Sequence, residues 1–205
     1  MQSEKCKVVR DRHLNFALCT DMKGEIMLKS DNAVSVIIDV QGKLAQLMHG
    51  RDTLFRSLQV MVRSFKVLEI PMIWMEQIPE NLGPTIPEVA QLLPDMKPIP
   101  KFTFSCCGNE QFMEKFRATD RKQVLICGIE SHICVYQTAV DLLNMGCEVQ
   151  VLCDCVSSRT PENRQLGIDR MKDAGAILTG IEMALFEMLE AAKGPRFKQI
   201  VKIIK

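Results

Sequence analysis

Cys134 is the residue whose position in this chain most favours covalent chemistry. It follows the apolar run Gln123–Cys127, which predicts a buried strand that ends at Gly128. Apolar residues at helical spacing come next: Val135, Ala139, Leu142 and Leu143. A thiol where a helix begins lies near unpaired N–H groups and the positive end of the helix dipole, which favour the thiolate and lower its pKa. We therefore expect Cys134 to be reactive, although an inert buried thiol is the alternative.

Asp39 and Lys101 are the charged residues that we expect beside Cys134. Asp39 ends the apolar run Val34–Ile38, and the carboxyl ends of parallel strands meet at one edge of a sheet, where ligands bind. A carboxylate at that edge can take the thiol proton as a general base. Lys101 follows a proline-rich loop and could hold the carboxylate or stabilise negative charge. A turn-forming role for Asp39 and a surface position for Lys101 are the alternatives.

The segments around these residues alternate between strand and helix patterns. Short apolar runs predict strands at 34–38, 71–75, 123–127, 148–153 and 176–178. Apolar residues recur at helical spacing after Asp52, an expected N-cap. Thr160 and Pro161 open another helix as N-cap and first-turn proline, and Thr179 with Glu182 forms a capping box for a later one.

This alternation predicts an α/β fold, specifically a three-layer α/β/α sandwich around a doubly wound, mainly parallel six-stranded sheet with Rossmann-like topology. The strands are apolar throughout, which is typical of a sheet covered on both faces. Residues 1–32 carry no clear period and are expected to be an N-terminal extension, with one domain over 33–205. The tail 195–205 carries an apolar stripe that we expect to dock on its own domain or on a sister subunit: Phe197, Ile200, Val201 and Ile204.

Composition excludes several classes of partner. The chain has 26 basic and 25 acidic residues, a net charge of +1 and 5% aromatic residues, so we expect no nucleic acid partner. No apolar run approaches the ~18 residues of a membrane span, and the N-terminus lacks the apolar segment of a secretory signal. We expect a soluble, cytoplasmic protein with no membrane partner; a mitochondrial location stays open, although acidic residues near the N-terminus disfavour a transit peptide.

The cysteines indicate a reducing compartment and no metal. Their number, nine, is odd, and they lie in predicted strands and at strand ends, so a disulfide framework is not expected. Cys106-Cys107 and Cys153-Asp154-Cys155 lack the C-x2-C spacing of zinc sites, and the chain holds three histidines. We therefore predict neither a metal nor another cofactor.

Three segments together resemble the signatures of the isochorismatase-like cysteine hydrolases, in order and in separation. They are Ile37–Gln41, Lys101–Ser105 and Gly128–Val135. The resemblance covers residues 33–205. Two further segments, Glu76–Glu88 and Pro195–Ile200, are similar to the isochorismatase-domain-containing branch found in animals and trypanosomatids.

The resemblance implies a role for each of these residues. Cys134 would be the nucleophile that forms a thioester, Asp39 the base that takes its proton, and Lys101 the neighbouring cation, which together make a Cys-Asp-Lys triad. Backbone N–H groups of Glu130 and Cys134 would form the oxyanion hole. A cis peptide bond is expected between Ile129 and Glu130.

The chain also departs from some members of this family. Nicotinamidases hold a metal through an Asp-x-His pair and a second histidine, but Met48–Gly50 and Glu76–Ile78 offer no such set, so we disfavour nicotinamide. Family members that cleave isochorismate have another residue in place of the cysteine. Because this chain keeps Cys134, we disfavour that reaction for it. His132 is two residues from the nucleophile and so does not face it on a helix. We expect it to be structural or to line the pocket, and we expect substrate contacts from Gln41 and Gln77.

The expected function is that of a metal-independent cysteine hydrolase that cleaves a small amide-type C–N bond through a thioester. Family members are usually dimers or larger, which implies a homo-oligomer with a small-molecule substrate. The alternative is a non-catalytic protein of the same fold that acts as an oligomeric interaction partner. A peroxide-sensing thiol is disfavoured because Cys127, in the strand, is poorly placed as a resolving cysteine.

Overall fold

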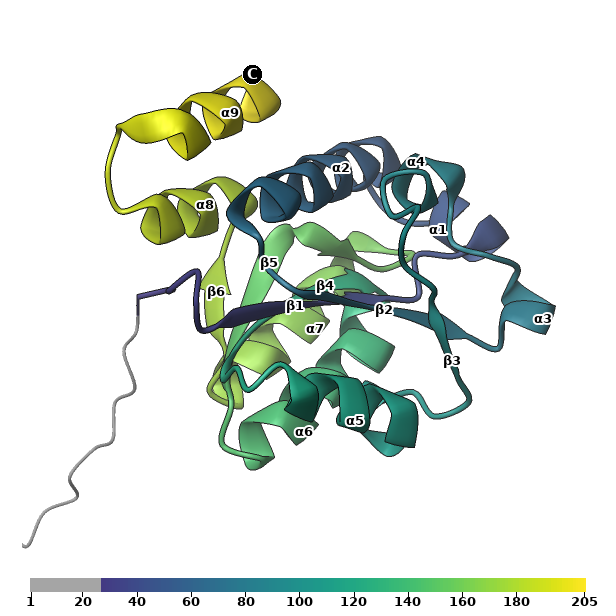
Figure 1. Cartoon of the computed structure of the whole chain (residues 1–205). Coiled ribbons are helices and arrows are strands. Elements are labelled where there is room, and N and C mark those ends of the chain that lie inside the picture. Colours follow the sequence, from purple (N-terminus) through teal and green to yellow (C-terminus); the bar gives the residue numbers. More distant parts are fainter. Residues whose placement is uncertain (1–26) are drawn as a thin grey trace, which may run out of the picture.

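A six-stranded sheet lies at the centre of the molecule, with helices on both faces (Figure 1). The computed structural model describes residues 27–205. The strand order is β3-β2-β1-β4-β5-β6, and every neighbouring pair is parallel. The predicted α/β/α sandwich with a parallel six-stranded sheet is therefore confirmed. The strands are β1 (Ala33–Ile38), β2 (Met72–Gln77), β3 (Ile99–Lys101), β4 (Gln123–Ile129), β5 (Glu148–Ser157) and β6 (Ile177–Thr179).

Two helical layers cover the sheet. One consists mainly of α2 (Arg51–Leu68) and α8 (Ile181–Leu189), with the short α1 (Gly42–Gln46) and α4 (Pro87–Ala90) beside them and α9 (Gly194–Ile204) packed on their outer side. The other consists of α5 (Glu110–Ala118), α6 (Tyr136–Asn144) and α7 (Pro161–Asp173). The remaining short helix, α3 (Pro79–Leu82), follows β2.

Burial in β1 explains why its sequence is apolar without alternation. Val34, Val36 and Ile38 pack with the layer of α5, α6 and α7. Ala33 and Ile37 pack with the layer of α2 and α8. Successive side chains of a strand point to opposite faces, so a strand between two helical layers has to be apolar at nearly every position.

Helix starts agree with the sequence in one case and differ in two. Thr160 caps α7, with its side chain accepting a hydrogen bond from Asn163 N at 3.2 Å, as predicted. The cap predicted at Asp52 is wrong, because α2 already starts at Arg51, so that Asp52 lies inside the helix and Gly50 is the N-cap. The capping box predicted at Thr179 is also wrong, because Thr179 belongs to β6. The carboxylate of Asp154 instead accepts a hydrogen bond from the first N–H of α8 at 3.0 Å.

No helix is predicted from the sequence at α5, and the strands β4 and β5 run further than predicted. Asn109 caps α5 by accepting a hydrogen bond from Phe112 N at 2.9 Å, an N-cap signal that precedes a short apolar pattern. Strand β4 continues through Gly128 to Ile129, and β5 continues to Ser157. The extra residues carry both strands to the edge of the sheet where Cys134 lies.

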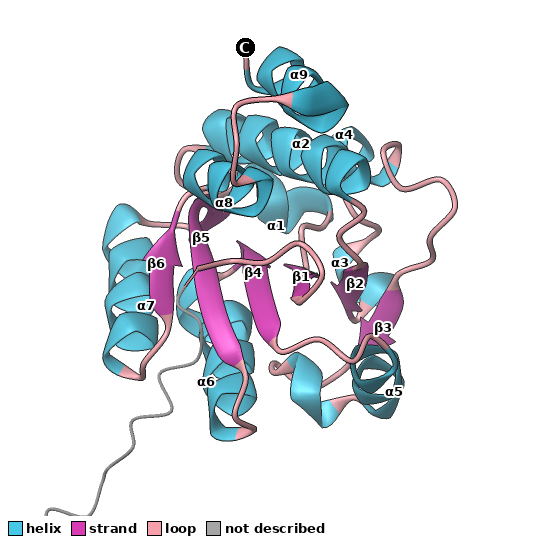
Figure 2. Cartoon of the chain, turned by 60° about the vertical axis from the view of Figure 1, so that its left-hand side comes forward, coloured by secondary structure: helices cyan, strands magenta, loops and turns pink. Residues whose placement is uncertain are grey.

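The segments just before β1 and after α8 both pack on the domain. Leu28 is buried in the core with α2 and α8, and its N–H donates to Glu187 at 3.1 Å. Part of the expected N-terminal extension therefore contacts the domain, and the rest of it, residues 1–26, lies outside the described residues. Helix α9 packs on α2 and α8 with Ile200 fully buried, so the apolar tail docks on its own domain (Figure 2).

None of the helices in residues 27–205 has the length and apolarity that crossing a bilayer requires.

Gly128 permits the close approach of β4 to β1 near the ends of the two strands, just before Asp39 and Cys134. Its φ is 116°, and an added Cβ would lie 2.0 Å from the carbonyl oxygen of Ile38, the residue it pairs with. An L side chain is strained at this φ and cannot occupy this space. Gly128 therefore holds the backbone next to Asp39 against the end of β4.

We expect Gly128→Ala to destabilise the protein by about 2 kcal/mol more than Gly175→Ala, because only the first adds overpacking to backbone strain. Gly175 is a matched control, since its φ is 108° and an added Cβ there meets nothing within 4 Å. Urea unfolding monitored by circular dichroism measures both. Equal losses of stability would show that the close contact with Ile38 is not what requires glycine at position 128.

Candidate active site

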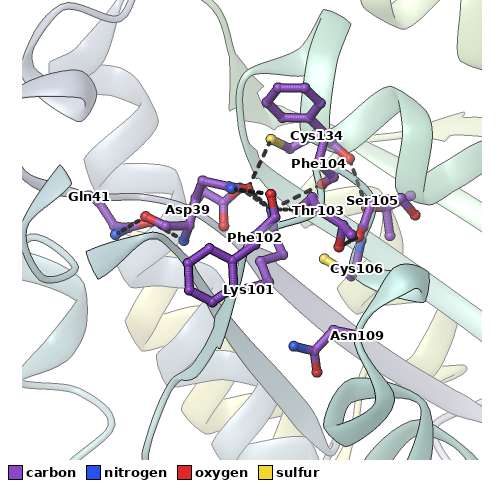
Figure 3. Close-up of polar contacts among 12 residues, drawn as sticks. Asp39, Gln41, Lys101, Phe102, Thr103, Phe104, Ser105, Cys106, Asn109 and Cys134 are labelled. Carbon is purple, nitrogen blue, oxygen red and sulfur yellow. Dashed lines mark hydrogen bonds and ion pairs between the residues drawn. The ribbon is translucent and has the colours of Figure 1, made fainter. Parts of the chain in front are cut away.

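Three segments far apart in the sequence place Asp39, Lys101 and Cys134 together at one edge of the sheet (Figure 3). Asp39 directly follows β1 in a left-handed conformation, with φ 53°. Lys101 is the last residue of β3. Cys134 lies in η2 (Ser131–Val135), a single π-helical turn between β4 and α6. Such turns are frequent at functional sites because they re-aim a side chain within a helix.

The ammonium group of Lys101 is fully buried and surrounded by four oxygen atoms. It donates to Asp39 Oδ2 at 2.7 Å and to Gln77 Oε1 at 2.5 Å. It also donates to the backbone carbonyl oxygens of Thr103 at 3.1 Å and Phe104 at 3.0 Å. A lysine has three N–H donors, so none is left for a further ligand.

Asp39 keeps one carboxyl oxygen free. Oδ1 is buried and has no donor of the described residues within normal hydrogen-bond distance, whereas Oδ2 is held by Lys101. Burial raises the pKa of Asp39 above its ordinary value, and the charge of Lys101 opposes this rise. The Cys134 thiol also interacts with the carboxyl group and lowers its pKa. A raised pKa makes the carboxylate a stronger base than an exposed aspartate. Asp39 is therefore oriented and free to accept a proton.

Cys134 is a protonated thiol at neutral pH. It is 7% exposed, and burial, assisted by the negative charge of Asp39, raises its pKa to about 12 although Lys101 lowers it. Its sulfur lies 4.0 Å from Gln77 Oε1. The lowered pKa expected from its position near a helix start is therefore wrong, because desolvation and a neighbouring carboxylate outweigh the helix end and the lysine. A thiol in this environment needs a base before it can attack.

Cys134 and Asp39 line the same cavity, which has a volume of about 120 Å³. Figure 3 shows the ring of Phe104 beside the sulfur. Nine residues line the cavity. Four of them carry the polar groups of the site, namely Asp39, Gln77, Glu130 and Cys134, and five are apolar, namely Leu44, Leu82, Phe104, Ile129 and Ile133.

The turn from β4 into η2 is held from two sides. The peptide bond between Ile129 and Glu130 is cis, at the position that the family resemblance implies. The Glu130 carboxylate accepts hydrogen bonds from the backbone N–H and the Nε of Arg159, both at 3.1 Å. On the other side, Gly167 of α7 lies so close that an added Cβ would come within 2.5 Å of the backbone of Ser131. The segment that carries Cys134 is thus fixed by packing and by an ion pair.

The residues expected to contact substrate, Gln41 and Gln77, and His132, expected to be structural or to line the pocket, differ in their placement. Gln77 lines the cavity and also donates from Nε2 to Phe102 O at 2.9 Å. Gln41 is fully buried outside the cavity walls, where it accepts from Gln77 N at 2.6 Å and donates to Gln77 O at 3.1 Å. His132 Nδ1 lies 3.0 Å from Ser158 Oγ and is also outside the walls. The structure thus makes Gln41 a support for Gln77 and gives His132 a structural partner.

Sequence reasoning missed the apolar walls of the cavity. Leu44 comes from α1 and Leu82 from α3, two short helices in loops after strands. Phe104 lies in the segment Lys101–Ser105, in which the sequence predicts a role for the lysine alone. Apolar residues in otherwise polar loops beside predicted strand ends are the signal that could have indicated these walls.

No group of three or more His, Cys, Asp or Glu side chains in residues 27–205 is arranged to hold a metal ion.

Comparison with known sequences gives matches over most of the chain. The family model of the isochorismatase domain matches residues 33–183. The secreted isochorismatase effector Isc1 of Phytophthora sojae is 37% identical over 180 residues, which cover 85% of each chain. Isochorismatase domain-containing protein 2 of Xenopus laevis is 40% identical over 144 residues, covering 70% of this chain and 69% of the relative.

Solved structures give matches of similar extent. MAR1 ribonuclease from Caenorhabditis elegans has a TM-score of 0.81 at 32% identity and covers 87% of this chain and 92% of its own. The YcaC gene product of Escherichia coli, described as an octameric hydrolase of unknown specificity, has a TM-score of 0.83. Its identity is 23%, over 89% of this chain and 91% of its own, so this likeness concerns the fold.

Because Lys101 and Asp39 are buried together, we expect Lys101→Met and Asp39→Asn each to lower the free energy of unfolding by about 3–5 kcal/mol. The double variant should lose clearly less than the sum, since it leaves no uncompensated buried charge. Denaturant unfolding of the four proteins measures this cycle. Additive losses would mean that the two groups do not stabilise each other.

Proposed function

The chain belongs to the isochorismatase family, and we propose that it is a cysteine hydrolase that cleaves the C–N bond of a small amide through a thioester on Cys134. The observation that carries this proposal is the arrangement of Asp39. One of its oxygens is held by Lys101, the other is free of hydrogen bonds from the described residues, and the carboxyl shares a cavity with the Cys134 thiol.

In the first half of the reaction, Asp39 takes the proton of Cys134 while the sulfur attacks the amide carbonyl carbon. The carbonyl oxygen becomes negative, and the backbone N–H groups of Glu130 and Cys134 would stabilise it; both residues line the cavity. Donors of this kind contribute roughly 2.7–4 kcal/mol each where they have been tested. The C–N bond then breaks, and the leaving nitrogen receives the proton from Asp39. The product of this half is a thioester and an amine.

In the second half, water attacks the thioester and gives its proton to Asp39. The C–S bond breaks, the sulfur recovers the proton, and a carboxylic acid is released. The sum is an amide plus water giving an acid and an amine, with no metal or cofactor required. Lys101 keeps Asp39 in one orientation through both halves and limits the rise of its pKa. Gln77 positions Lys101 and lies near the sulfur.

The proposal extends to assembly and has one alternative. The octameric description of the YcaC gene product supports a homo-oligomer. The alternative is a non-catalytic protein that keeps the fold for interaction with other copies. Its supporting observation is that Cys134 rests as a buried, protonated thiol.

We expect a panel of small primary amides to include at least one that the protein hydrolyses and that Cys134→Ala does not, because the variant lacks the thiol on which the proposed thioester forms. Ammonia release measures the rate. Cys147→Ala is the matched control, since Cys147 is a partly exposed thiol outside the cavity and should be dispensable. Full activity of the Cys134→Ala variant would overturn the role of Cys134 as the nucleophile. No activity of the natural chain on any amide would favour the non-catalytic alternative.

Asp39→Asn should lower kcat by roughly 10²–10⁴-fold with a smaller change in KM, because it removes the general base. The pKa of Asp39 is raised from its ordinary value, and catalysis needs the ionised form. Activity of the natural chain should therefore fall as the pH drops through that raised pKa, at a higher pH than an exposed aspartate would give. Rates across the pH range test this, and an acid limb that survives in Asp39→Asn would assign it to another group.

A further inference from the structure

We infer that the substrate is a small uncharged amide with a short apolar acyl group and that the site rejects carboxylates. This inference rests on the proposed hydrolase function and concerns its specificity. Five of the nine residues that line the cavity have apolar side chains: Leu44, Leu82, Phe104, Ile129 and Ile133. A polar or charged acyl group would lose its water against these walls without gaining a partner.

Charge at the site disfavours an anion. Among the described residues, those that line the cavity include two acidic side chains, Asp39 and Glu130, and no lysine, arginine or histidine. Lys101 beside Asp39 is surrounded by four oxygens, and the charge of Arg159, which is outside the cavity lining, is balanced by Glu130. A carboxylate or phosphate that enters the cavity would therefore meet negative charge and no cation among the lining residues.

Size limits the acyl group to a few carbon atoms. The cavity holds about 120 Å³, whereas sites for drug-sized ligands measure roughly 300–1,000 Å³. Phe104 lies beside the sulfur and closes one side of this space (Figure 3). A short aliphatic amide fits such a volume, and a nucleotide or a substituted ring does not.

The names of two relatives suggest substrates of the opposite kind. One is called an isochorismatase effector and another a ribonuclease, and isochorismate and RNA are both anions. The walls of this cavity provide neither the charge nor the space for them. The inferred substrate class therefore separates this chain from the activities that those names indicate.

The test compares two alkylating agents of nearly equal size that differ in charge, iodoacetamide and iodoacetate. The rate of labelling of Cys134 is measured for each by mass spectrometry of its peptide, and the ratio of the two rates is compared with the ratio at the same thiol in the urea-unfolded chain. We expect the folded protein to prefer iodoacetamide by at least roughly tenfold more than the unfolded chain does. An unchanged or reversed ratio would overturn the inference.

A positive charge added to the cavity wall should weaken the preference of Cys134 for iodoacetamide over iodoacetate. Leu82→Lys places a cation on the lining, and we expect it to move the ratio toward iodoacetate by roughly tenfold. Leu47→Lys is the matched control, because Leu47 follows α1, is 63% exposed and does not line the cavity. Circular dichroism establishes that both variants fold. An equal shift in both variants would mean that general surface charge, and not the cavity, sets the preference.

Turnover then separates this inference from the proposed function. Butyramide and succinamate have the same amide group and differ in a terminal methyl or carboxylate. We expect hydrolysis of butyramide with a kcat/KM at least roughly tenfold higher. Equal or faster hydrolysis of succinamate would overturn the substrate class and leave the hydrolase intact. Selective labelling by iodoacetamide without hydrolysis of any amide would support the uncharged specificity of the cavity and overturn the hydrolase.

Discussion

The buried contact between Lys101 and Asp39 is the interaction on which the rest of the site depends. Moving two charges out of water is unfavourable unless their geometry and hydrogen bonds offset the loss of hydration. Here one ammonium group contacts a carboxylate, an amide side chain and two backbone carbonyls at 2.5–3.1 Å. These bonds fix Asp39 and Gln77 and hold the loop that carries Phe104, which lies beside the sulfur. A single cation thereby organises both the chemistry and one wall of the cavity.

The environment of the thiol follows from the same burial. Cys134 and Asp39 both have raised pKa values because both are removed from water. Desolvation thus favours a neutral thiol and strengthens the nearby base, so the proton can move within the site when a carbonyl group arrives. In such an arrangement, reactivity comes from the contact between two groups and not from a thiolate that is present beforehand. This restricts reaction to molecules that fit between the apolar walls.

Much of the fold could be predicted because apolar runs without alternation have few explanations other than strands between two helical layers. The same reasoning located Asp39 and Cys134, since residues after parallel strands meet at one edge. The walls from Leu44 and Leu82 could not be predicted, because short helices in loops have no period to detect. The rise in the pKa of Cys134 could not be predicted either, because it depends on burial and on the carboxylate of Asp39, 95 positions away in the chain. Gln41 shows a third limit, since a buried amide and a substrate-binding amide look alike in a sequence.

The apolar lining has an effect on the last step of the proposed reaction as well as on the first. Hydrolysis of a neutral amide converts an uncharged molecule into an acid that ionises at neutral pH. The ionised product would then lie among side chains that cannot solvate it and next to the Asp39 carboxylate. The walls that admit the neutral amide therefore favour dissociation of the charged product. They also disfavour the reverse reaction, because the carboxylate would have to re-enter the cavity.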